Sequence, residues 1–95
     1  MALTFEWDEN KSKHNLKKHG VAFEEAKTVF NDPFSITVPD PDHSEEEERY
    51  LDIGLSSQGR LLVIWYNEKE DHIRIIECRK ATRSERKNYE ETESK

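Results

Sequence analysis

Five short stretches of the chain have the pattern of β-strands. Residues 3–7, 34–38, 50–55 and 73–79 alternate apolar and polar positions, the period of a strand with one buried face. Residues 61–66 are apolar on both faces, which is typical of a strand covered on both sides, so this strand is expected at the centre of the sheet. The last three strands follow one another with short turns, which predicts an antiparallel meander.

Two helices are predicted between the first and second strands. The first begins after Asp8, whose carboxylate can accept hydrogen bonds from a first helical turn, and ends at Gly20, where a left-handed residue closes a helix. The second ends before Pro33, because proline disfavours the helical conformation of the residue before it. Its apolar stripe is formed by Phe23, Ala26 and Phe30.

The first helix has a polar stripe where an amphipathic helix would carry leucines. The stripe consists of Lys11, Asn15, Lys18 and His19. We interpret it as solvent-facing, with the alternative that Asn15 and Lys11 bind loop carbonyls or a partner.

A third helix is predicted directly after the last strand. Thr82 and Glu85 have the spacing of a capping box, in which each side chain bonds the backbone amide of the other residue. The element order is then strand, helix, helix, four strands, helix. This order predicts an α+β fold in which a largely antiparallel sheet is covered by helices.

The composition predicts one domain with a thin core. Of the 95 residues 33% are hydrophobic and 38% charged, so apolar surface for burial is limited. We expect residues 1–91 to form a single domain and residues 92–95 to form a disordered tail.

The compartment is predicted from cysteine use and from the N-terminus. There is one cysteine, Cys78, and the N-terminus lacks a basic flank followed by an apolar run, so neither disulfides nor a signal peptide are expected. No stretch approaches the roughly 20 apolar residues of a membrane span. A cytoplasmic protein with Cys78 as a small core residue is expected.

Charge is segregated along the chain. Residues 72–87 contain six basic and two acidic residues, although the whole chain has a net charge of −6. Residues 21–48 contain nine acidic residues and one basic residue. We interpret the acidic segment 40–48 as a solvated loop, with a docking surface for a basic partner as the alternative.

Motifs at both ends of the chain resemble those of a known family. The N-terminal motif comprises Phe5-Glu6-Trp7-Asp8, Lys11, Asn15, Lys18-His19-Gly20-Val21, Phe23, Glu25 and Ala26. The C-terminal motif comprises Arg74-Ile75-Ile76, Arg79-Lys80-Ala81-Thr82, Glu85-Arg86 and Tyr89. Together they resemble the BrnT toxins of bacterial type II toxin–antitoxin pairs over nearly the whole chain. Ala22 departs from the pattern, because family members commonly have there a serine that caps the second helix.

The resemblance implies a RelE-like fold and a ribonuclease that needs no metal or cofactor and arrests translation. It also implies a hetero-oligomer with a BrnA-type antitoxin that neutralises the toxin. Operator DNA would be contacted only through this antitoxin. A catalytically weak or inactive interaction module, acting with its antitoxin in operon repression, is the alternative.

Metal-free RNA cleavage needs a base for the 2′-hydroxyl, donors for the phosphate oxygens and a proton for the leaving oxygen. Arginine suits the phosphate because its rigid fork of donors stays charged. The candidates are Arg79, Arg83 and Arg49 at the phosphate, Glu77 or His72 as base, Tyr89 as hydroxyl donor, and Arg74, Lys80, Arg86 and Lys87 in substrate binding. Each arginine has the alternative of a surface residue paired with a neighbour.

Strand alternation separates two of these candidates. Arg74 and Arg79 are five residues apart and are expected on opposite faces of the strand, unless it twists or bulges between them. No metal site is predicted, because His14 and His19 lie about 140° apart around a helix and no other cluster has ligand spacing.

Overall fold

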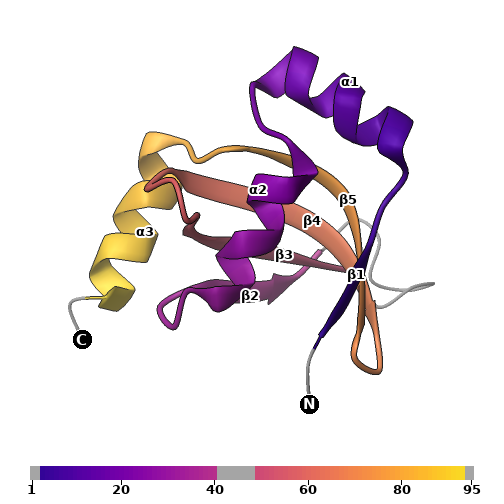
Figure 1. Cartoon of the computed structure of the whole chain (residues 1–95). Coiled ribbons are helices and arrows are strands. Elements are labelled where there is room, and N and C mark those ends of the chain that lie inside the picture. The colour runs from indigo at the N-terminus through magenta and orange to yellow at the C-terminus, as the bar shows by residue number, and fades with distance from the viewer. Residues whose placement is uncertain (1–2, 41–48, 94–95) are drawn as a thin grey trace.

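The computed structural model describes residues 3–40 and 49–93 (Figure 1). The elements in chain order are β1 (Thr4–Glu6), α1 (Glu9–His19), α2 (Phe23–Lys27), the 3₁₀ helix η1 (Thr28–Asn31), β2 (Ile36–Pro39), β3 (Arg49–Leu55), β4 (Leu61–Lys69), β5 (His72–Lys80) and α3 (Arg83–Glu93). The predicted α+β class is confirmed. None of the helices in these residues is long and apolar enough to cross a bilayer.

The five strands form one sheet in the order β1-β5-β4-β3-β2. The expected antiparallel meander of β3, β4 and β5 is present, and β2 pairs antiparallel with β3. Only β1 runs parallel to its neighbour, β5. β4 is central, as its two apolar faces predicted.

Helices cover both faces of the sheet (Figure 1). On one face, α2 and η1 contribute Phe23, Ala26 and Val29 to a core shared with the even-numbered residues of β4, such as Leu62 and Ile64. On the other face, Tyr89 of α3 packs with Ile53, Leu61 and Val63. The alternation along β4 therefore supplies two separate cores, each limited in size by the small apolar fraction of the chain.

The first helix has the predicted ends. The Asp8 carboxylate accepts from the amides of Asn10 and Lys11, at 2.8 and 3.2 Å, and Gly20 adopts the left-handed conformation with φ 74°. At the following helix, where Ala22 supplies no side-chain cap, the hydroxyl of Ser12 accepts from the Phe23 amide at 3.2 Å. A residue of α1 thus satisfies one of the free backbone amides at the start of α2.

The polar stripe of α1 is not uniformly solvent-facing. Asn15 is buried, and its side-chain amide nitrogen donates to the carbonyls of Val21 and Cys78 while its oxygen accepts from the Cys78 amide. Among the described residues β1 pairs with His72–Arg74, and no strand pairs with the rest of this edge of β5. Asn15 binds that edge as a neighbouring strand would. The alternative interpretation was therefore correct for Asn15.

Several predicted boundaries were wrong. The second helix turns 3₁₀ at Thr28, β2 begins at Ile36 instead of residue 34, and α3 continues through Glu93, two residues into the expected tail. Residues 94–95 lie outside the described residues, as do residues 41–48 of the acidic segment. Its first residue, Asp40, is buried and pairs with Arg49 at 3.2 Å, so it is not solvated.

A buried carboxylate in the first core provides a stability test. Asp52 accepts a hydrogen bond from the Tyr66 hydroxyl at 2.9 Å, and burial raises the pKa of Asp52. A raised carboxyl pKa favours the folded state at acid pH, and this contribution is lost as the pH rises above the usual Asp range. Asp52→Asn, which keeps an acceptor for Tyr66, should therefore stabilise the fold by about 1 kcal/mol at pH 8 and change it little at pH 3.

Thermal melts at both pH values would check this prediction. The exposed Asp71→Asn is the control and should be neutral at both. An Asp52→Asn variant that melts lower than the natural protein at pH 8 would show that the ionised form is required.

Candidate functional site

A β-bulge in β5 brings the predicted residues to one face. Glu77 lies opposite Trp65 but Ile75 lies opposite Tyr66, so Ile76 is an extra residue in the strand. A bulge shifts the alternation of side chains by one position. Ile75 and Cys78 consequently both point into the first core, and Arg74 and Arg79 both lie on the opposite face. Simple alternation would have placed Arg74 and Arg79 on opposite faces. The strand instead bulges between them, which is the exception stated with that prediction.

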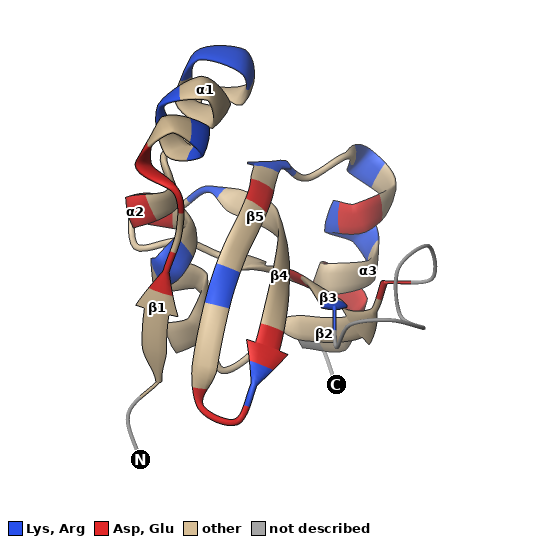
Figure 2. Ribbon diagram, turned by 90° about the vertical axis from the view of Figure 1, so that its right-hand side faces the viewer, with Lys and Arg blue, Asp and Glu red and all other residues tan. Residues whose placement is uncertain are grey.

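This face carries half of the predicted site residues, and we call it the basic sheet face. Its members are Arg49 of β3, Asn67 of β4, and His72, Arg74, Glu77 and Arg79 of β5. α3 covers the neighbouring part of the same side of the sheet, over Ile53 and Val63. Figure 2 shows α1 and α3 on either side of β4 and β5, with basic residues on both helices.

The exposed half of the basic sheet face holds its charges in weak pairs. Glu6 of β1 contacts both His72, at 2.8 Å, and Arg74, at 3.5 Å, and these three side chains are each 45–49% exposed. Exposed pairs contribute little stability, so an anionic ligand can compete with Glu6 for Arg74.

Arg79 is held more firmly than its neighbours. Its guanidinium makes two parallel bonds to Glu85, of 2.8 and 2.9 Å, and lies over the Trp65 ring at 5.1 Å from the centroid. Glu85 and Thr82 also form the predicted capping box. The Arg79 hydrogen bonds lower the pKa of Glu85 to about 2, so this pair stays ionised across the neutral range and joins β5 to α3.

Three groups of candidates lie elsewhere. Lys80 is paired with Leu62, so it lies on the side of α2. Tyr89 is buried and its hydroxyl donates to Asp32 at 2.6 Å, away from the basic sheet face. The third group, Arg83, Arg86 and Lys87, is exposed on α3.

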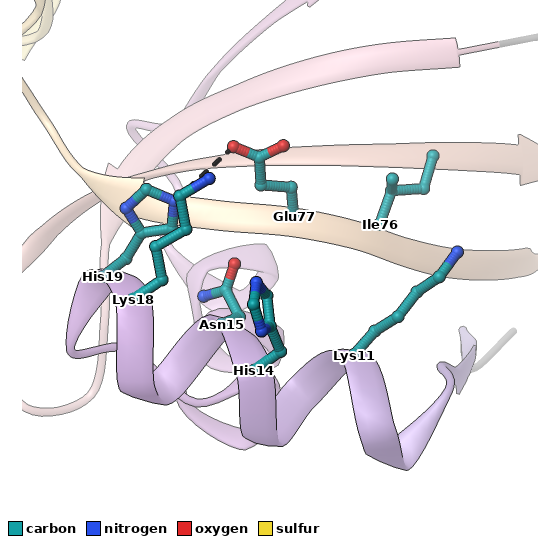
Figure 3. A pocket seen from close by; sticks show the side chains of 7 residues that line it. All are labelled: Lys11, His14, Asn15, Lys18, His19, Ile76 and Glu77. Atoms are coloured by element: carbon teal, nitrogen blue, oxygen red, sulfur yellow. Dashed lines mark ion pairs between the residues drawn. The ribbon is translucent and has the colours of Figure 1, made fainter.

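A pocket of about 120 Å³ opens between α1 and β5 (Figure 3). Lys11, His14, Asn15, Lys18 and His19 line it from α1, and Ile76 and Glu77 from β5. Nε2 of His19 lies 3.8 Å from Oε2 of Glu77. His19 is not among the site residues predicted from the sequence, although it belongs to the polar stripe and to the N-terminal family motif. The bulge residue Ile76 contributes to the pocket wall.

The potential metal ligands of the described residues are dispersed. Within residues 3–40 and 49–93, no three His, Cys, Asp or Glu side chains lie together as a metal ion would require. Cys78 is buried, as expected of a core residue, and burial raises the pKa of its thiol to about 12.

Comparisons with known proteins agree with this architecture. The crystal structure of the Brucella abortus ribonuclease toxin BrnT, determined at 1.1 Å, superimposes with a TM-score of 0.66 over 86% of this chain and 100% of that one, at 19% identity. At that identity the match shows a shared fold. No curated protein matches the sequence. The family model described as "Ribonuclease toxin, BrnT, of type II toxin-antitoxin system" matches residues 7–85, and the chain therefore belongs to the BrnT family of type II toxin–antitoxin systems.

Proposed function

We propose that this chain is an endoribonuclease that cleaves RNA by metal-independent attack of the 2′-hydroxyl on the adjacent phosphorus. The RNA would lie along the basic sheet face between α1 and α3. The observation that carries the proposal is the bulge at Ile76, because it collects Arg74, Glu77 and Arg79 on one exposed face. Membership of a ribonuclease toxin family supports it.

The residues of this face suit the parts of the reaction. Arg74 and Arg49 would hold phosphates of the strand, and Arg79 would approach the phosphate that reacts. Trp65 offers a ring on which a base can stack, although Arg79 covers part of it. Arg83, Arg86 and Lys87 would extend the positive field along α3.

Membership of the same family supports a proposal for the biological role. We propose that cleavage arrests translation in the cytoplasm and that a BrnA-type antitoxin neutralises the chain in a hetero-oligomer, through which operator DNA is contacted. The RelE-like description of the fold stays a prediction.

The test is cleavage of a naked RNA by the purified chain in excess EDTA. We expect activity to persist and the products to carry 2′,3′-cyclic phosphate and 5′-hydroxyl ends, because no metal activates the attacking oxygen. Loss of cleavage in EDTA with rescue by magnesium would contradict the mechanism. Induced expression should arrest growth, and co-expression of the antitoxin should restore it.

A further inference from the structure

We propose that His19 is the group that transfers the proton in RNA cleavage, in the pocket between α1 and β5, and that Glu77 is a positioning residue that orients its ring. This inference rests on the proposed ribonuclease function and assigns a residue to it. The sequence predicts Glu77 or His72 as the base. His72 lies beside Glu6 at the other end of β5, outside the pocket.

The fold fixes the geometry of the pair. His19 is the last residue of α1, and the left-handed Gly20 ends the helix directly after it. Asn15, one turn earlier, is bonded to both backbone groups of Cys78, the residue next to Glu77. The helix end and the strand are therefore tied together at the point where His19 meets Glu77, and Figure 3 shows both side chains directed toward each other.

The surroundings of the ring suit proton transfer beside a phosphate. The His19 side chain is 23% exposed, so it can reach a substrate, and imidazole exchanges protons near neutral pH. The charged or titratable groups around it are Lys11, His14 and Lys18 from α1 and Glu77 from β5. Arg79 lies two residues further along the same face of β5. A phosphate in the pocket would meet the cations Lys11 and Lys18 of α1.

The step balances without another reactant. A ring nitrogen of His19 takes the 2′-hydroxyl proton as the O2′–P bond forms, and the P–O5′ bond breaks. The proton then passes to O5′ from the ring or through water. The products are a 2′,3′-cyclic phosphate and a 5′-hydroxyl, while Lys11 and Lys18 offset the charge on the non-bridging oxygens.

The test uses the purified full chain and an RNA oligonucleotide with one cleavage site. We expect His19→Gln to lower kcat on the order of 100-fold with little change in KM, and to remove the acidic limb of the pH–rate profile. Added imidazole should restore part of the activity of His19→Ala. Glu77→Gln should keep that limb and lower kcat with little change in KM, because the ring is still present but has lost the carboxylate that orients it.

The controls are Lys17→Gln and Glu24→Gln, exposed residues outside the pocket, which should cleave at the natural rate. Thermal melts of each variant separate loss of fold from loss of chemistry, and His19→Asn replaces His19→Gln if the latter unfolds. If the natural chain does not cleave RNA, the proposed function fails together with this inference. If the natural chain cleaves RNA and the folded His19 variants cleave equally well, or imidazole gives no rescue, this inference alone is overturned.

Discussion

Replacing Arg60 by alanine is expected to lower the free energy of unfolding by about 3–5 kcal/mol at pH 7. Arg60 donates from Nε to Glu25 at 2.9 Å and makes a second, shorter contact to the same carboxylate. The Glu25 side chain is only 4% exposed, so removal of the guanidinium leaves a buried charge with Ser56 as its remaining side-chain donor. Arg60 also donates to the carbonyl of Gly20, so α1, α2 and the β3–β4 turn are loosened together.

The destabilisation caused by Arg60→Ala should depend on pH. Hydrogen bonds from Arg60 lower the pKa of Glu25, so the stability that this carboxylate contributes is present at neutral pH and is lost on acidification. In Arg60→Ala the lone carboxyl can protonate, and the gap to the natural protein should narrow below about pH 4. Thermal melts would measure this difference in stability, because Tm changes by roughly 4–8 °C per kcal/mol for a domain of this size.

Two further variants make the result specific to the buried charge. Arg60→Ala combined with Glu25→Gln should recover part of the loss, because the buried group is then neutral. Arg86→Ala, on the exposed surface of α3, should melt within a degree or two of the natural protein. Equal melting of Arg60→Ala and Arg86→Ala would show that Glu25 finds other solvation.

Arg79→Ala is expected to lower RNA cleavage by two or more orders of magnitude, as loss of a donor to a reacting phosphate does. It should also cost stability, about 1–2 kcal/mol, because Arg79 pairs with Glu85 and covers Trp65. Activity must therefore be compared at a temperature where each variant is folded.

Glu85→Gln is the matched control for Arg79→Ala. It removes the same ion pair, and glutamine can still bond the Thr82 amide in a capping box. It should therefore lose similar stability while it keeps the guanidinium and most of the cleavage. If both variants lose cleavage equally, Arg79 acts through the β5–α3 connection. If Arg79→Ala instead releases the antitoxin in a pull-down while growth arrest persists, Arg79 belongs to a docking surface.

Local sequence determined the elements of this protein, both ends of α1 and the start of α3. Asp8 and Gly20 bound α1, Thr82 and Glu85 form the capping box of α3, and the two apolar faces of 61–66 place β4 in the centre. These features were predictable because caps and periodicity act between residues a few positions apart. The family was recognisable from the sequence for a related reason, because each of its two motifs is formed by residues close together near one end of the chain.

Only the tertiary structure decided which candidates share a face and which groups are buried. The bulge at Ile76 is established by the pairing of β5 with β4, and it reverses the alternation that had separated Arg74 from Arg79. The burial of Asn15 depends on an open strand edge 63 positions away, and the Glu25–Arg60 pair spans 35 positions. His19 and Glu77 meet for the same reason. Such contacts depend on how the strands pair and where the helices pack, so they cannot be predicted from the residues next to them in the sequence.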